Sequence, residues 1–293
     1  MYYLFRFASV VIPRLPRWFV VTLANVISPV AWLVASKARK QANAHMIHVL
    51  GPQVLATRAG RKRLRRTVRG IFRNSARNYL EVFLLPYTQP EWIMSHADVK
   101  GQEHLEAALA LGKGVVLCAA HTGPFEYLIQ WLSIKGYQVT VPVERLKDQR
   151  MLDLMLRLRR SQGIHFIPLG GNSPLRAIIQ ALRKNQLVLI TADRAVEGES
   201  VEKSFFGEPA RLPSGPVSLS KHTGAPLVGA FGWYTPAKRM AGLFVPLSLE
   251  LTEEERANTD TLMCVLIEMM EQNIKAHPED WVVFSPIWIS KIH

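Results

Sequence analysis

Hydrophobic positions near the start of the chain form one long uncharged run. The segment from Trp18 to Ser36 contains nineteen residues without a charged side chain. A membrane-spanning helix needs roughly 20 apolar residues, and Asn25 and Pro29 within this run weaken insertion and favour a kink. We therefore expect an interfacial or partly inserted anchor, with a full span and a buried core helix as the alternatives.

A second helix is predicted around Arg58 to Arg77, where apolar and cationic side chains follow the same helical period. The apolar positions are Leu64, Val68, Phe72, Ala76, Tyr79 and Phe83, and the cationic positions are Lys62, Arg66, Arg69, Arg73 and Arg77. A helix with one apolar and one purely cationic face suits an anionic bilayer surface. The alternative is the solvated face of a core helix, although such faces usually mix charges of both signs.

From about Asp98 onward, short apolar runs alternate with amphipathic segments. The expected strands are 114–119, 137–143, 164–168, 187–191, 226–231 and 243–249, and the expected helices are 124–135, 148–162, 174–184, 214–223 and 252–275. This alternation predicts an α/β fold with a mostly parallel central sheet flanked by helices. We divide the chain into a basic, apolar, helical membrane-anchoring region (1–85) and an α/β domain (86–293).

The charge of the chain sharpens this division. The 293 residues carry a net charge of +13, yet residues 1–80 hold fifteen basic side chains and no acidic one, since Glu81 is the first carboxylate. A cationic segment of this kind indicates a polyanionic binding partner, either a membrane surface or a nucleic acid. No groove-reading or base-stacking motif follows, and an apolar segment has no purpose in nucleic-acid binding. We expect an anionic membrane surface as the partner and no nucleic acid.

Composition excludes several other classes of protein. With 48% hydrophobic residues, the chain is not expected to be disordered. Two cysteines, Cys118 and Cys264, do not make a disulfide scaffold, and Cys118 is interpreted as a core residue of a strand. Without clustered Cys and His ligands, no metal site is expected.

The candidate chemistry lies at the end of the first of these strands. His121 follows that strand directly, and Gly123 and Pro124 open the next helix. Glu126 then falls in the first helical turn, from which it can turn back toward the imidazole. A carboxylate that binds one ring nitrogen leaves the other free as a general base. The alternative is a helix-stabilising glutamate beside a structural histidine.

The motif His121-X4-Glu126 is similar to the His-X4-Asp/Glu motif of the lysophospholipid acyltransferase superfamily. The resemblance is greatest to the branch of lipid A lauroyl/myristoyl acyltransferases and phosphatidylinositol mannoside acyltransferases. It extends to segments 43–51, 143–148, 157–163, 191–194, 205–210, 213–216 and the closing His277–Trp281. Ala195 stands where many relatives carry a second acid.

The resemblance implies transfer of a fatty acyl chain from acyl-CoA or acyl-carrier protein to a hydroxyl group of a glycolipid or phospholipid. In this hypothesis His121 is the general base, Glu126 orients it, and backbone N–H groups near Gly123 stabilise the oxyanion. The implied substrate-binding residues are Arg145, Arg159, Arg160, Asp193, Arg194 and Glu202, with Glu197 and Glu199 as alternatives to Glu202. Which of Arg159 and Arg160 serves the site stays open.

The same resemblance implies where the protein acts and what it requires. The acyl thioester is a substrate, so no cofactor and no metal are expected. We expect the protein at the cytoplasmic face of the inner membrane, either peripheral or held by a single N-terminal anchor. The competing hypothesis is a catalytically inactive membrane- or lipid-binding protein of the same fold.

Overall fold

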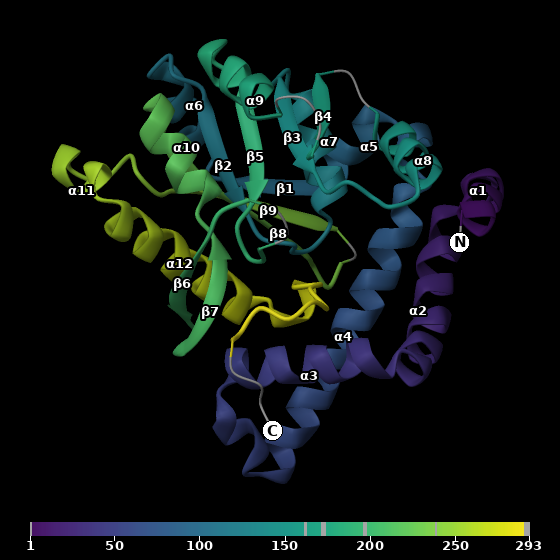
Figure 1. Cartoon of the computed structure of the whole chain (residues 1–293). Coiled ribbons are helices and arrows are strands. Elements are labelled where there is room, and N and C mark those ends of the chain that lie inside the picture. Colours follow the sequence, from purple (N-terminus) through teal and green to yellow (C-terminus); the bar gives the residue numbers. More distant parts are fainter. Residues whose placement is uncertain (1, 161–162, 171–173, 196–197, 238, 290–293) are drawn as a thin grey trace.

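The central element of the fold is a seven-stranded, mostly parallel sheet (Figure 1). The computed structural model describes residues 2–160, 163–170, 174–195, 198–237 and 239–289. The strand order is β1 (Ala97–Lys100), β9 (Met240–Pro246), β8 (Leu227–Tyr234), β2 (Val115–Ala119), β5 (Leu187–Thr191), β3 (Val139–Val143) and β4 (Ile164–Pro168). Within this sheet, only β8 and β9 pair in an antiparallel direction among the described residues. The predicted α/β class is therefore confirmed.

Helices cover both faces of the sheet, because alternate residues of a strand point to opposite sides. In β2, Val115 and Leu117 face one hydrophobic cluster, while Val116 and Cys118 face the other. The first cluster includes α6 (Gln102–Ala110), α7 (Phe125–Ile134) and α8 (Gln149–Arg159), and the second includes α9 (Pro174–Arg183), α10 (Gly215–Thr223) and α12 (Thr259–Ala276). Every residue of β2 is buried, as expected for a central parallel strand.

Two expected elements differ in the structure. No strand is expected between the strand 187–191 and the helix 214–223, but the structure has β6 (Ser200–Phe205) there, which pairs with β7 (Glu208–Pro213) in a separate antiparallel hairpin. The expected helix 252–275 is divided into α11 (Glu253–Ala257) and α12, because the side chain of Asn258 accepts hydrogen bonds from the first N–H groups of α12. The expected end of helix 148–162 lies outside the described residues.

The hydrophobic core includes residues from both sides of residue 85, the expected boundary between the anchoring region and the α/β domain. Helices α3 (Ser36–Leu50) and α4 (Arg58–Val82) bury Met46 and Val68 in the same cluster as Cys118. Short α5 (Pro90–His96) then leads into β1. As predicted, α4 is amphipathic, and Lys62, Arg66, Arg69 and Arg73 are exposed. Two of its residues differ from the prediction, because Arg77 is drawn inward and Tyr79 is exposed.

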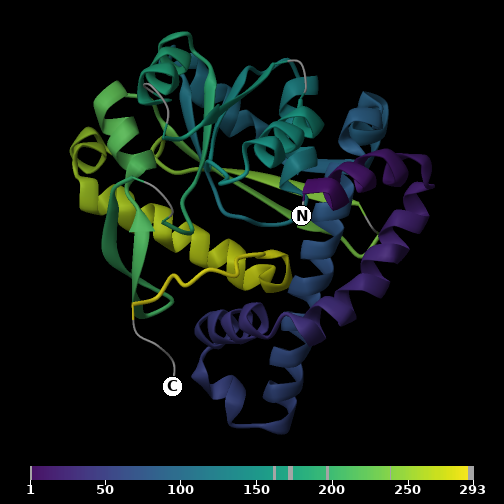
Figure 2. The same cartoon turned by 45° about the vertical axis from the view of Figure 1, so that its right-hand side comes forward.

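The first two helices lie outermost. Helices α1 (Tyr2–Val11) and α2 (Arg17–Val34) run along the side of the molecule, with α2 beside α4 (Figure 2). Their exposed large apolar side chains are Tyr3, Leu4, Phe7, Val10, Trp18, Phe19, Val26, Ile27, Val30, Leu33 and Val34. On length and composition alone α2 could cross a membrane, and only 17% of it is buried.

Candidate active site

The loop that carries His121 is held by contacts from two distant parts of the chain. The carbonyl of His121 accepts a hydrogen bond from the backbone N–H of Val282 at 2.9 Å. Gly123 has a φ of +58°, a conformation that glycine adopts without strain. Its N–H donates to the carbonyl of Asp280, and its own carbonyl accepts from Asn78 Nδ2, both at 3.0 Å. These contacts leave the loop little freedom.

His121 is paired with Asp193. Nδ1 of His121 lies 2.8 Å from Asp193 Oδ1, and the backbone N–H of His121 donates to Oδ2 at 2.9 Å. Trp281 Nε1 donates to the same Oδ2 at 2.8 Å. Strands β2 and β5 are neighbours with Ala119 opposite Thr191, so both residues of the pair lie two positions beyond matched strand ends. A parallel sheet places such residues at one edge.

The electrostatics of this pair suit proton transfer. Burial alone would raise the pKa of the fully buried Asp193 carboxyl, but the His121 charge and the three hydrogen bonds outweigh it and lower that pKa. The ionised carboxylate fixes the Nδ1–H tautomer of His121. Nε2 has no hydrogen-bond partner among the described residues, and a quarter of the His121 side chain is exposed. Nε2 is thus free to accept a proton.

Glu126 does not occupy the position expected of it. It lies in the first turn of α7 as predicted, but its carboxylate pairs with Arg159 Nη2 at 2.6 Å, while Asp193 takes the predicted place beside the imidazole. Burial raises the pKa of the Glu126 carboxyl, and Arg159 opposes that shift. Between the two candidate arginines, it is Arg159 that contacts Glu126, whereas Arg160 is exposed.

The remaining predicted substrate residues are scattered. Arg145 is exposed after β3, Arg194 pairs with Glu144 at 3.0 Å, and Glu202 is exposed on β6. Glu199 is also exposed, and Glu197 lies outside the described residues. Within the described part of the chain, none of these side chains hydrogen-bonds with His121, Glu126 or Asp193.

Three further expectations concern Asp193, the backbone near Gly123 and Cys118. Asp193 was expected to contact substrate, but it is fully buried and binds His121 instead. Backbone N–H groups near Gly123 were expected to stabilise an oxyanion, and that of Gly123 itself donates to the carbonyl of Asp280. Cys118 is fully buried in β2, and burial raises the pKa of its thiol, so the interpretation as a core residue is confirmed.

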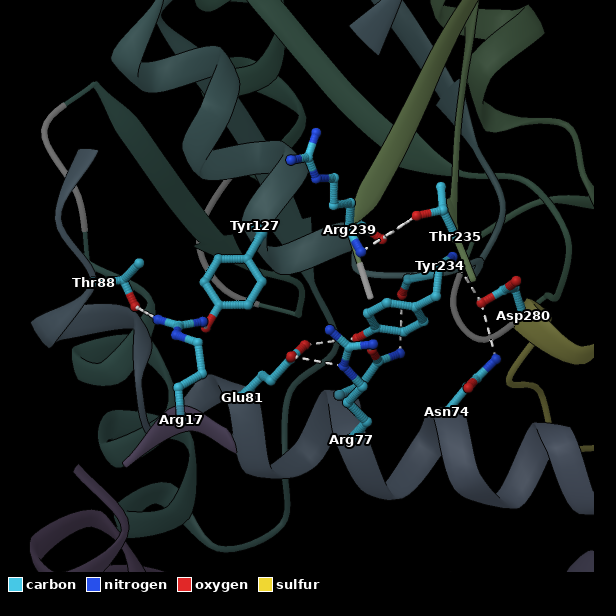
Figure 3. A network of polar contacts seen from close by, with 12 residues as sticks. Arg17, Asn74, Arg77, Glu81, Thr88, Tyr127, Tyr234, Thr235, Arg239 and Asp280 are labelled. Carbon is cyan, nitrogen blue, oxygen red and sulfur yellow. Dashed lines mark hydrogen bonds and ion pairs between the residues drawn. The ribbon is translucent and has the colours of Figure 1, made fainter. Parts of the chain in front are cut away.

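A polar network on the inner side of α4 supports the loop (Figure 3). Asn74 Nδ2 donates to Asp280 Oδ1 at 3.0 Å, and Arg77 pairs with Glu81 at 2.8 Å. The hydroxyl of Tyr234 lies 2.5 Å from Asn78 Oδ1 and 2.7 Å from Glu81 Oε2 and shares its single proton between these two acceptors. The helix that exposes a cationic face to solvent therefore also holds the His121 loop through Asn78.

The network extends to the start of α2. Arg17 Nη1 donates to the hydroxyl of Tyr127 at 2.7 Å, and Nη2 donates to Thr88 Oγ1 at 2.6 Å (Figure 3). The Arg17 guanidinium also lies 3.5 Å from the centre of the Trp92 ring. Burial raises the pKa of Tyr127 to about 12, which keeps this hydroxyl neutral. The N-terminal helices are thus joined to α7 beside Glu126.

Sequence reasoning missed several of these residues. Along α4, polar residues recur at helical spacing at Asn74, Asn78 and Glu81. This spacing indicates a buried polar face, a signal that the cationic stripe of the same helix concealed. The sequence marks Trp281 only as the last residue of a closing motif and indicates no role for it. Among the described residues, no three His, Cys, Asp or Glu side chains gather as metal ligands.

Comparison with known proteins gives a consistent result. A sequence model of bacterial lipid A biosynthesis acyltransferases matches residues 1–290. The phosphatidylinositol mannoside acyltransferase of Mycobacterium tuberculosis is 34% identical over 220 residues, which cover 74% of this chain and 68% of the relative. The protein of the same name from Mycolicibacterium smegmatis is 28% identical over 227 residues, which cover 77% of this chain and 73% of the relative.

Proposed function

The chain belongs to the bacterial lipid A biosynthesis acyltransferase family, and from this membership we propose that it transfers a fatty acyl group to a glycolipid hydroxyl. The acyl donor is a thioester, either acyl-CoA or acyl-carrier protein. Phosphatidylinositol mannosides are the first acceptors to test, because two relatives are named for them. The observation that carries the proposal is the His121–Asp193 pair with a free Nε2.

In the proposed reaction, His121 Nε2 takes the proton of the acceptor hydroxyl as its oxygen attacks the thioester carbonyl. Asp193 stabilises the resulting imidazolium through Nδ1–H, and Trp281 keeps the carboxylate oriented. The tetrahedral intermediate collapses with rupture of the C–S bond, and the leaving thiolate receives the proton from His121. The products are the acylated lipid and a free thiol, and no covalent acyl-enzyme is formed.

Glu126 and Arg159 have a different proposed role in this scheme. The ion pair links the first turn of α7 to the end of α8, and Gln130 of α7 donates to the carbonyl of Arg159 at 3.1 Å. These two contacts hold α7, whose first turn follows the His121 loop, against the end of α8. Glu126 is thus proposed as a positioning residue. Of the two candidate arginines, Arg159 and Arg160, Arg159 is proposed as the one that contacts substrate.

We also propose that α1 and α2 attach the enzyme to a membrane. Eleven large apolar side chains are exposed on α1 and α2, which run along one side of the molecule, and α4, which carries exposed arginines, lies beside α2 (Figure 2). Monomeric soluble proteins rarely expose large apolar patches, so this concentration favours attachment to a membrane. Such a placement brings the enzyme to its lipid acceptor, at the cytoplasmic face of the inner membrane, where acyl thioesters are available.

The decisive experiment follows free thiol released from acyl-CoA or acyl-carrier protein, with purified phosphatidylinositol mannosides as acceptors. His121→Asn is expected to lower kcat by about 10²–10⁴-fold, and His222→Asn, on an exposed face of α10, serves as the matched control. Near-normal turnover by His121→Asn would overturn the mechanism. Absence of thiol release from the unaltered protein, with vesicle binding retained, would favour the inactive lipid-binding alternative.

A further inference from the structure

A second candidate site lies between α2 and α4. A cavity of about 280 Å³ is lined by Ser28, Pro29, Trp32, Leu33 and Arg69. The inner side of α4, with Asn74 and Asn78, faces the His121 loop, whereas Arg69 is exposed. The cavity is therefore separate from the active site.

The Trp32 ring is surrounded by positive charge. The guanidinium of Arg39 lies 4.9 Å from the ring centre and that of Arg69 lies 4.8 Å from it. Arg39 is held in place by donating to the carbonyls of Trp32 and Leu33. Arg69 has no ion-pair partner among the described residues, so its N–H donors remain available.

Trp32 contributes its ring to the cavity rather than its N–H group. Trp32 Nε1 is buried and meets no acceptor within the described part of the chain, and because protein atoms cover it, a ligand in the cavity cannot reach it. The ring positions the Arg69 guanidinium, which stacks on it. Residues 1–80 contain no carboxylate that could pair with Arg69.

From these contacts we infer that the cavity binds the phosphate group of an anionic membrane lipid. Arg69 supplies the N–H donors, and Arg39 adds positive charge. The exposed side chain of Leu33 lines the cavity and offers apolar surface for the acyl chains, and Val30 is exposed about one turn before it. This border favours a lipid headgroup over a free phosphate ion, and the size of the cavity suits a headgroup rather than a whole lipid.

The inference rests on the proposed membrane placement but not on the acyl-transfer chemistry. The test is sedimentation of the full-length protein with vesicles of phosphatidylcholine, with or without phosphatidylglycerol. Each exposed arginine contributes about fivefold to binding of an anionic surface, wherever it lies. Arg63→Gln, on the same helix but outside the cavity, measures this diffuse effect.

Arg69→Gln is expected to weaken binding to anionic vesicles about tenfold more than Arg63→Gln, because it also removes charge-assisted hydrogen bonds. Trp32→Leu keeps all charges but removes the ring on which Arg69 stacks. It is expected to weaken binding to anionic vesicles about threefold to tenfold and to leave binding to neutral vesicles near that of Trp18→Leu. Trp18 is an exposed tryptophan of the same helix, away from the cavity.

Equal losses for Arg69→Gln and Arg63→Gln, together with equal behaviour of the two tryptophan variants, would overturn the site. Displacement from anionic vesicles by inorganic phosphate, beyond that caused by chloride at the same ionic strength, would overturn the lipid assignment in favour of free phosphate. Failure of the unaltered protein to bind either vesicle would instead overturn the membrane placement on which the inference rests.

Discussion

Asp193 Oδ1 lies 2.8 Å from His121 Nδ1, although seventy-two positions separate the two residues in the sequence. Both oxygens of the carboxylate are used, because Oδ2 accepts from the backbone of His121 and from Trp281. The imidazole is therefore held in one tautomer and one orientation before substrate arrives. Such preorganisation is what a general base needs.

Asp193→Asn should nearly abolish turnover while preserving the fold. An amide in this position can present its NH₂ group to Nδ1 and force the proton onto Nε2, which then cannot accept the hydroxyl proton. We expect kcat to fall by about 10³–10⁴-fold. Thiol release measures the loss, and Asp153→Asn, on an exposed position of α8, is the control. A change of less than about tenfold would contradict the assigned pair.

Trp281→Phe should remove one hydrogen bond to the Asp193 carboxylate while keeping an aromatic ring in the core. Phenylalanine keeps the stack on His45, whose ring centre lies 5.3 Å away, but removes the hydrogen bond to Oδ2. We expect about 1.5–3 kcal/mol lower free energy of unfolding at neutral pH. Because the pKa of Asp193 is lowered in the fold, this share of stability exists above the ordinary aspartate pKa and is lost as pH falls.

Urea unfolding of Trp281→Phe and the unaltered protein should therefore differ at neutral pH and converge at acid pH. A constant difference across the whole range would mean that Trp281 contributes packing alone.

Arg159→Gln should destabilise the protein through Glu126. The carboxylate of Glu126 is buried, and its partner's removal leaves a charge without compensation, at a cost of about 3–5 kcal/mol. Because burial raises the pKa of Glu126, the loss grows as pH rises and shrinks as the carboxyl becomes protonated in acid.

A double-mutant cycle isolates this pair. Glu126→Gln combined with Arg159→Gln should unfold at a higher urea concentration than Arg159→Gln alone at neutral pH. Additive losses would show that the two side chains do not depend on each other.

Because of Asp280, the free energy of unfolding should fall as pH rises toward neutrality. Burial raises the pKa of this carboxyl to about 7, so the folded protein holds a proton that the unfolded chain releases near pH 4. The stabilising effect is complete below the unfolded pKa and is lost as pH rises through 7, by up to about 4 kcal/mol. Asp280→Asn should flatten this dependence in urea unfolding curves, and parallel curves for the two proteins would contradict the expectation.

Leu4→Glu should release the protein from vesicles. Leu4 is 67% exposed on α1, so the substitution costs little in the folded state but removes an apolar side chain from the proposed membrane face. We expect at least about tenfold weaker partitioning into phosphatidylcholine vesicles. Leu111→Glu, at a leucine that is 54% exposed on the α/β body, is the matched control and should leave partitioning unchanged.

The sequence by itself determined the local elements and the position of His121 directly after a strand. The apolar runs placed β2 and β5, and the residues that follow these strands include His121 and Asp193. The helical period and the charge pattern placed α2 and α4. These features depend on contacts between near neighbours in the chain, which is why periodicity alone predicts them.

Only the tertiary structure decided which groups meet. Pairing of β2 with β5 brings Asp193 to His121, and packing of α8 against α7 brings Arg159 to Glu126. The sequence argument placed Glu126 beside the imidazole and Asp193 against the substrate, because Glu126 is the carboxylate nearest to His121 along the chain. Strand order and helix docking arise from contacts between residues far apart in the chain, and the local pattern carries no information about them. For the same reason, the cationic stripe of α4 did not reveal that the other side of this helix holds the His121 loop.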